Sequence, residues 1–534
     1  MKFLKNFHRN SKKTYKNTII LSLLILTAFF IRILWINTIP GGIYPDEAMN
    51  GTDALTTWEQ KDFKLFYENN NGREGLFINL IALSSQVLGN TIIGLKIWSI
   101  LFGTLTVLGI YLLGKELFSS NRLGLYAAFL CTFSFWAINF SRISFRAISL
   151  PLILTFSFYF LFKGLRTKVF LPFMISGFIF GLGFHTYIAF RIAPAILIVI
   201  FIFLLLSKKD ALRTYWKHGL VFLFFMLLAV SPMLYDFIEN PQHFSSRSSS
   251  ISIFSSEINH GDFWGTLKET FTLSIIKYFT WGDQNWRHNI PPFPILDIFT
   301  SIAFGVGLIT LIWKFLYTLR KRIIFKERDR ELLVTSFLLG WFFLMLAPEF
   351  LTNESLPHAL RSIGTQPAVF ILASLPFLWI SRIPSKKYFS PFIASIVILI
   401  FISLINLFLY FVFWGTSQES KSAFNSVFTQ QAYYIQSLED TLPIYVFANG
   451  PGQTVSDGLP VSAQVIRYLT FDQKNVTFLT TLEEPPTIPS IFIPMNYNDS
   501  ILTLLKERFH GKITTKKIVP EDQVSSFTVI FLEP

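Results

Sequence analysis

Long apolar runs separated by short polar stretches dominate residues 1–414. After a first run over about 18–39, others lie near 92–114, 122–140, 147–163, 169–187, 191–207, 219–236, 295–316, 332–351, 363–380 and 389–414. About 20 apolar residues let a helix cross the ~30 Å hydrocarbon core of a bilayer. The pattern therefore predicts a polytopic α-helical membrane protein with about eleven transmembrane helices.

One further run, at 75–89, has only about fifteen residues, so it is either a short span or a helix lying in the interface. Loops rich in Lys and Arg stay in the cytoplasm, and this bias decides between the two. If 75–89 does not cross, five basic loops all face the cytoplasm, at 115–122, 163–168, 208–217, 320–330 and 382–387. We therefore interpret 75–89 as an interfacial helix.

The first seventeen residues carry six Lys or Arg and no acid, and no small-residue cleavage site follows the first run. This predicts an uncleaved anchor with its N-terminus in the cytoplasm. Two long loops then lie outside, at 39–90 and 238–294, and the chain ends outside.

The composition becomes more polar after residue 414. Short strand-like pieces occur at 443–447, 475–479, 490–494 and 527–532, and helix-like pieces at 461–469 and 499–509. Alternating strands and helices are typical of an α/β fold. We predict a membrane domain over 1–414 and a small extracytoplasmic α/β domain over 415–534.

Composition excludes several classes of protein. Hydrophobic residues make up 51% of the 534, and only 15% are charged, where a soluble domain carries roughly 25%. This excludes a soluble enzyme and a disordered chain, and the single cysteine, Cys131, excludes an intrachain disulfide. The net charge of +13 is assigned to cytoplasmic loops facing anionic lipid rather than to nucleic-acid binding.

Two acids, Asp46 and Glu47, follow Pro45 in the first outward loop. The stretch 46–59 can form a helix, and a carboxylate at its N-terminus is stabilised by free backbone N–H groups and the helix dipole. Asp46 is therefore either a helix cap or a general base held at the membrane surface.

A second outward set is basic, against the positive-inside bias. Its members are Arg73 and Glu74 in NGREG, Arg142 and Arg146 in FSRISFR, His185, Tyr187 and Arg191 in GFHTYIAFR, and His358 and Arg361 in LPHALR. A single outer arginine snorkels to lipid headgroups or pairs with an acid. Several together fit a shared polar pocket better, because guanidinium groups bind phosphate in a bidentate way.

These motifs resemble a known family. PDEA at 45–48, GREGLF at 72–77, FSRISFRAISLP at 140–151 and HTYIAFR at 185–191 are similar to motifs of the GT-C glycosyltransferases. Within them, the chain resembles bacterial relatives of the protein O-mannosyltransferases and the lipid A aminoarabinose transferase. The resemblance covers about the first 210 residues well and the later spans only by layout.

The resemblance implies an integral enzyme of a bacterial-type plasma membrane. It would transfer a sugar from a polyprenyl-phosphate donor to an acceptor hydroxyl or amine on the extracytoplasmic side, with inversion. In the family the acid at the place of Asp46 is the catalytic base, and Glu47 matches the second acid of the pair. The further acid of the aminoarabinose transferases is missing here, because RISFRAISLP contains none.

The remaining outward residues are then assigned to the donor phosphate and sugar, with Arg142 and Arg146 placed for the phosphate. They are Arg73, Glu74, Arg142, Arg146, His185, Tyr187, Arg191, His358 and Arg361. No nucleotide-binding fingerprint is present, and no metal or other cofactor is required. A divalent ion held by Asp46, Glu47 and Glu74 stays open, although no spacing demands one.

Two other functions remain as alternatives. A transporter or flippase also has many spans, but its ionisable residues gather near the bilayer midplane in repeated halves. A lipid-linked glycan polymerase or ligase keeps the chemistry and changes the acceptor. Neither sugar nor acceptor follows from the sequence.

Overall fold

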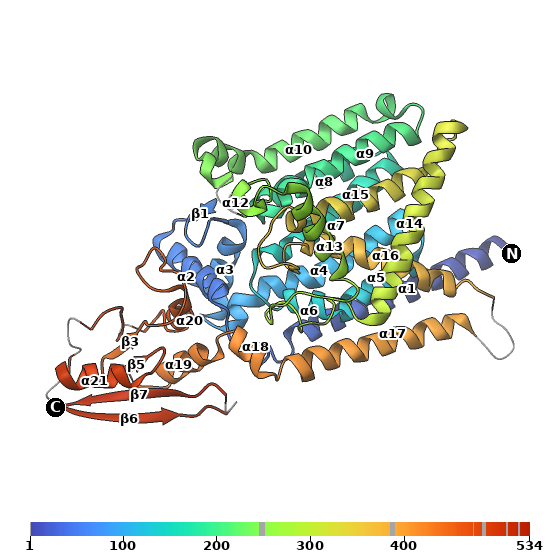
Figure 1. Ribbon diagram of the computed structural model, residues 1–534. Coiled ribbons are helices and arrows are strands. Elements are labelled where there is room, and N and C mark those ends of the chain that lie inside the picture. Colours follow the sequence, from blue (N-terminus) through green and yellow to red (C-terminus); the bar gives the residue numbers. More distant parts are fainter. Residues whose placement is uncertain are drawn as a thin grey trace. The chain divides into compact units, whose positions relative to one another are not determined.

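The computed structural model describes residues 2–244, 251–384, 390–439, 441–473, 475–482, 487–508, 511–521 and 524–534, with side chains from residue 15 onwards. The basic side chains at 2–13, and part of the basic loop at 382–387, therefore lie outside the described residues. The described chain is mostly helical, as predicted (Figure 1).

Nine helices in the described residues are long and apolar enough to cross a membrane. The first is Tyr15–Ile33 within α1 (Lys2–Ile33). The others contain α4 (Ile92–Phe118), α7 (Ser149–Thr167), α9 (Pro194–Ser207), α10 (Ala211–Glu239), α14 (Ile298–Ile324), α15 (Arg330–Phe350), α16 (Gln366–Ile380) and α17 (Pro391–Leu407). Short 3-10 turns extend α7, α9 and α16 at their N-terminal ends, and a π-helix extends α17 over Phe408–Trp414. The predicted fold class is confirmed.

Two of the eleven predicted runs do not give helices of full membrane length. The run at 169–187 forms α8 (Phe170–Leu182) followed by a 3-10 turn. The run at 122–140 is divided into α5 (Asn121–Phe133) and α6 (Phe135–Phe140). Ser134 between them is extended, and the N–H of Phe135 donates instead to Oδ1 of Asn406, at 2.9 Å.

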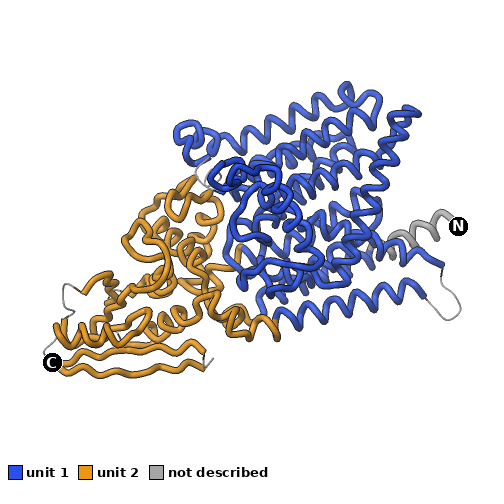
Figure 2. The backbone as a smooth tube through the Cα atoms, in the orientation of Figure 1, with its two compact units in different colours: residues 1–34, 99–410 blue, residues 35–98, 411–534 orange. Residues whose placement is uncertain are grey.

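The described residues group into two compact units (Figure 2). One contains residues 1–34 and 99–410, which hold most of the apolar helices. The other contains residues 35–98 and 411–534. The long loop at 39–90 thus belongs to the same unit as the C-terminal α/β region.

Within the second unit, the 39–90 region forms α2 (Pro45–Gln60), a hairpin of β1 (Phe66–Tyr67) and β2 (Arg73–Glu74), and α3 (Leu76–Leu88). Helix α3 has 13 residues, too few to span a bilayer alone, and it packs against α2. Helix α2 also packs against α20 (Gln464–Leu469). Gly51 allows this approach, because a Cβ there would lie 2.5 Å from the Tyr468 ring.

The C-terminal region contains a five-stranded mixed sheet in the order β4-β3-β5-β7-β6. Its strands are β3 (Ile444–Phe447), β4 (Val476–Leu479), β5 (Ser490–Pro494), β6 (Lys512–Ile518) and β7 (Phe527–Glu533). Strand β3 pairs in parallel with β4 and β5, whereas β7 is antiparallel to β5 and β6.

The four predicted strands and both predicted helices of this region are present, the second helix as α21 (Asp499–Arg508). Phe492, Ile530 and Leu505 form part of its apolar core. The edge strand β6 was missed, because its sequence KITTKKI is mostly polar and exposed.

Candidate functional site

The first turn of α2 carries both predicted catalytic acids. Tyr44 is the N-cap residue, Pro45 opens the helix, and Asp46 and Glu47 follow. Oε1 of Glu47 accepts the backbone N–H of Tyr44 at 3.2 Å. This is the reciprocal half of a capping box, which satisfies a donor left free at a helix start.

The two carboxylates lie in different environments. The side chain of Glu47 is fully buried, and its Oε2 lies 3.5 Å from Nζ of Lys96, which is also fully buried. Asp46 is half-buried and accepts a hydrogen bond of 2.9 Å from Nδ2 of Asn70. Glu47 is thus held by the fold, whereas part of the Asp46 side chain remains accessible.

Arg73 ties the β1–β2 hairpin to α2. Its guanidinium is 2% exposed and donates to Oδ1 of Asn50 at 2.6 Å. It also forms an ion pair with Asp53 and a hydrogen bond with Oδ1 of Asn69. Because Asn69 precedes Asn70, Arg73 fixes the turn that carries the hydrogen-bond donor to Asp46. Glu74 next to it is also 2% exposed.

Arg142 and Arg146 are four residues apart but meet different surroundings. Arg142 is fully buried, and its Nη1 donates to the carbonyls of Ile31, Arg32 and Leu34 at 3.1, 2.8 and 2.7 Å. It therefore satisfies the carbonyls at the C-terminal end of α1, which a helix leaves without internal partners. Arg146 is half-buried and lies over the ring of Tyr187, 5.6 Å from its centroid.

A cavity of about 340 Å³ gathers four of the predicted residues, Tyr187, Arg191, His358 and Arg361. Its remaining wall is largely apolar and includes Ile188, Phe244, Pro348 and Leu351. We call it the Arg191–Arg361 pocket. It combines two positively charged arginine side chains with an apolar lining. A lipid with an anionic head would require this combination.

Both arginines of this pocket also have protein partners. Arg191 donates to the carbonyls of His243 and Phe244. Arg361 donates to Oγ1 of Thr352 at 2.8 Å and to the carbonyl of Glu354 at 3.0 Å, and it forms an ion pair with the Glu354 side chain. His185, by contrast, does not line the pocket, and its Nε2 lies 2.9 Å from the carbonyl of Ala229.

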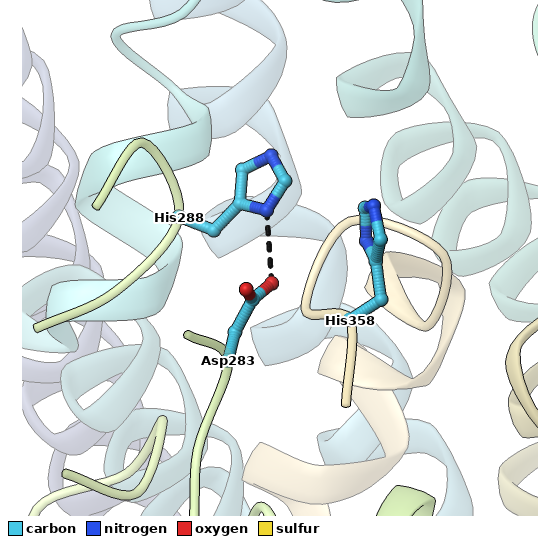
Figure 3. Close-up of side chains that lie close together, drawn as sticks. All are labelled: Asp283, His288 and His358. Carbon is cyan, nitrogen blue, oxygen red and sulfur yellow. Dashed lines mark hydrogen bonds and ion pairs between the residues drawn. The ribbon is translucent and has the colours of Figure 1, made fainter. Parts of the chain in front are cut away.

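A cluster that the sequence analysis missed lies beside this pocket. Asp283, His288 and His358 each offer a possible ligand atom, and these atoms lie within 4.8 Å of one another. Figure 3 shows the Asp283 carboxylate joined to the His288 ring, with the ring of His358 next to them. The bond links Nδ1 of His288 to Oδ2 of Asp283 at 2.8 Å. We call these residues the Asp283 cluster.

Charge and burial set the protonation of the Asp283 cluster. Burial favours the neutral acid, but His288, His358 and the Ala359 N–H outweigh it and lower the pKa of Asp283 to about 2. Burial, and then the electrostatic interaction with His288, hold the pKa of His358 well below its usual value. At neutral pH, Asp283 is therefore ionised and His358 is neutral.

The position of His358 is fixed by a buried ion pair. Its backbone N–H donates to Oε1 of Glu349 at 2.9 Å, and Glu349 pairs with Lys277, with both side chains fully buried. Asp283 and His288 are five residues apart in one loop, and His358 comes from another. The two loops meet only in the folded chain, so their spacing in the sequence gave no signal.

Comparisons with known proteins agree with this architecture. The family model described as dolichyl-phosphate-mannose-protein mannosyltransferase matches residues 76–235. No functionally curated protein matches the sequence. The apo structure of ArnT from Cupriavidus metallidurans matches with a TM-score of 0.55 and 11% identity, covering 97% of this chain and 98% of that one.

The same ArnT bound to undecaprenyl phosphate matches with a TM-score of 0.54 and 12% identity, over 96% of this chain and 97% of that one. At such low identity the match concerns the fold. It extends over nearly the whole chain, including the C-terminal region for which the motifs gave no resemblance. The chain therefore has the GT-C glycosyltransferase fold, as its short motifs predicted.

Proposed function

We propose that this chain is a membrane glycosyltransferase. It transfers a sugar from a polyprenyl-phosphate donor to a hydroxyl or amine of an acceptor, with inversion at the anomeric carbon. The observation that carries the proposal is the difference in burial between the two acids of α2. Glu47 is buried against Lys96, whereas Asp46 is half-buried at the same helix end, so Asp46 is the acid that a substrate can reach.

The reaction follows from this arrangement. Asp46 accepts the proton of the acceptor O–H or N–H while that atom attacks the anomeric carbon. The bond between the anomeric carbon and the phosphate oxygen breaks, and the polyprenyl phosphate leaves with the electron pair. A single displacement of this kind inverts the anomeric configuration, and a positioned base contributes roughly 10²–10⁴-fold to its rate.

The Arg191–Arg361 pocket is the proposed binding site for the donor. A polyprenyl phosphate has an apolar chain and a charged head, and the pocket offers an apolar wall with two guanidinium groups. These groups would also stabilise the charge that develops on the leaving phosphate. The undecaprenyl phosphate bound by ArnT of the same fold supports a carrier of this class.

The sidedness of the site belongs to the same proposal. The nine apolar helices make the chain an integral membrane protein. The positive-inside bias places its N-terminus in the cytoplasm and the α/β region outside. The donor sugar and the acceptor then meet on the extracytoplasmic side, where no nucleotide is needed.

The test is transfer by purified Asp46→Asn protein. Labelled undecaprenyl-phosphate sugars are supplied with membrane-derived acceptors, and both product and released undecaprenyl phosphate are measured. We expect at least a ~10²-fold loss of rate, because the amide cannot take the proton. Asp62→Asn is the matched control, since Asp62 is an exposed acid in the same loop that pairs with Lys64.

Two controls accompany the expected loss of rate. Asp46→Asn should keep the wild-type thermal stability, and Asp62→Asn should keep the wild-type turnover. Near wild-type turnover in Asp46→Asn would contradict its role as the base. Movement of the labelled lipid across a vesicle membrane without any new product would contradict the enzyme and favour a flippase.

A further inference from the structure

The Asp283 cluster contains two ring nitrogens that its hydrogen bonds do not involve. One bond joins Nδ1 of His288 to Asp283. However, Nε2 of His288 and Nδ1 of His358 are both buried, and neither has a hydrogen-bond partner among the described residues. Leaving a buried polar atom without a partner costs about 1–3 kcal/mol. Two such atoms in one cluster require an explanation beyond packing.

A purely structural role explains the pairing of Asp283 with His288 but not the position of His358 beside them. An Asp–His pair alone accounts for the 2.8 Å bond, and the chain has another such pair in Asp236 and His243, joined at 2.9 Å. Among the described residues, no third His, Cys, Asp or Glu lies close enough to that second pair to offer a further metal ligand. In the Asp283 cluster the ring of His358 adds one, with its centroid 4.8 Å from that of His288.

We propose that Asp283, His288 and His358 bind a divalent transition-metal ion of the Zn²⁺ class. Two imidazoles and one carboxylate are a common three-ligand set for Zn²⁺ and leave a fourth position open. Zinc–ligand distances are about 2.0–2.2 Å, so donors on one ion lie at most about 4 Å apart. The three ligand atoms lie within 4.8 Å of one another, so the side chains must draw closer together when the ion binds.

The surroundings orient these ligands. Asp283 accepts the backbone N–H of Ala359 at 2.7 Å through Oδ2 and that of Asn285 at 2.9 Å through Oδ1. Glu349 holds the backbone of His358. Such contacts fix the direction of metal ligands, and losing one typically lowers metal affinity about 10–100-fold.

His358 also lines the Arg191–Arg361 pocket. The open fourth position of the ion would therefore be available to an oxygen of the donor phosphate. This second step rests on the proposed function, whereas metal binding itself does not.

The test uses the purified full-length chain, stripped with chelator and loaded with Zn²⁺ or Co²⁺. We expect one bound equivalent per chain after desalting, measured by elemental analysis. His288→Gln, His358→Gln and Asp283→Asn should each weaken Zn²⁺ binding at least about 10–100-fold. His243→Gln is the matched control, because it removes the histidine of the other Asp–His pair, and it should retain the metal.

A second variant distinguishes lost ligation from lost folding. In His288→Cys, Co²⁺ should show a thiolate-to-metal charge-transfer absorption that the wild type does not have, because the new sulfur would be a direct ligand. Substoichiometric metal in the wild type, or unchanged Zn²⁺ affinity in the three ligand variants, would overturn the proposal.

The relation to the donor is measured separately. Binding of undecaprenyl phosphate is compared between stripped and Zn²⁺-loaded protein, and we expect tighter binding when the metal is present. Equal affinity would overturn the phosphate step while leaving metal binding intact. Failure of the Asp46→Asn experiment would overturn the proposed function while leaving the measured metal stoichiometry unchanged.

Discussion

Glu47 and Lys96 form an ion pair in which neither side chain is exposed to solvent, with Oε2 and Nζ 3.5 Å apart. The pair joins the first turn of α2 to the N-terminal part of α4, so it holds the helix end that carries Asp46. Adjacent acids on one helix turn thus lie in different environments, with Glu47 buried in an ion pair and Asp46 partly accessible.

We expect Lys96→Met to destabilise the protein by roughly 3–5 kcal/mol, because it removes the positive charge that lies 3.5 Å from the buried Glu47 carboxylate. Glu47→Gln, which retains a capping side chain, should also destabilise the chain, because it removes the negative charge beside the buried Lys96. The double variant should be more stable than either single variant. Thermal unfolding of the purified protein in detergent measures all three, and wild-type stability in both single variants would refute a coupled pair.

Arg142→Ala should lower thermal stability, whereas Arg146→Ala should not. The reason is that Arg142 satisfies three carbonyls at the end of α1 from a fully buried position. Hydrogen bonds to a charged group contribute about 1.5–3 kcal/mol. For Arg146→Ala we expect weaker use of the donor at unchanged stability. The prediction is wrong if the two variants unfold at the same temperature.

Substitutions at Glu354 and Arg361 should change donor affinity in opposite directions. Arg361→Ala removes a charge-assisted contact to the phosphate and should raise the Kd for undecaprenyl phosphate about 10–100-fold. Glu354→Gln releases Arg361 from its ion pair and should lower that Kd. Titration with the lipid at constant salt measures both, and changes of the same sign would place the phosphate elsewhere.

Asn70→Gly tests how Asp46 is oriented. Asn70 has a φ of +49°, which glycine adopts without strain, so this substitution removes the amide without distorting the turn. Loss of its hydrogen bond to Asp46 should reduce kcat about 10-fold, less than Asp46→Asn does, with little change in KM. If kcat stays at the wild-type value, Asn70 has no part in holding the base.

Local patterns were enough to predict much of the fold. Short strand-like apolar pieces marked β3, β4, β5 and β7, and long apolar runs marked most of the spanning helices. The break at Ser134 was not predictable in this way, because the run at 122–140 contains no proline. It depends on Asn406, 271 residues after Phe135.

The candidate site shows the same limit. PDEA identified the start of α2, since a proline followed by acids is typical of a helix N-terminus. The burial of Glu47 depends on Lys96, and the environment of Arg142 depends on carbonyls more than a hundred residues earlier in the chain. The Asp283 cluster also combines distant loops. The residue types indicated the chemistry of the site. The environment of each side chain depends on tertiary contacts, which the sequence does not show.

The contact between Phe135 and Asn406 has a consequence for biosynthesis. The N–H of Phe135 stays without this acceptor until the ribosome has added those 271 residues, which takes on the order of 10–50 s at ordinary elongation rates. Throughout that interval the α5–α6 break lacks the contact with Asn406 that it has in the folded chain. Insertion of α17, late in synthesis, is therefore the step that completes the early part of the helical bundle.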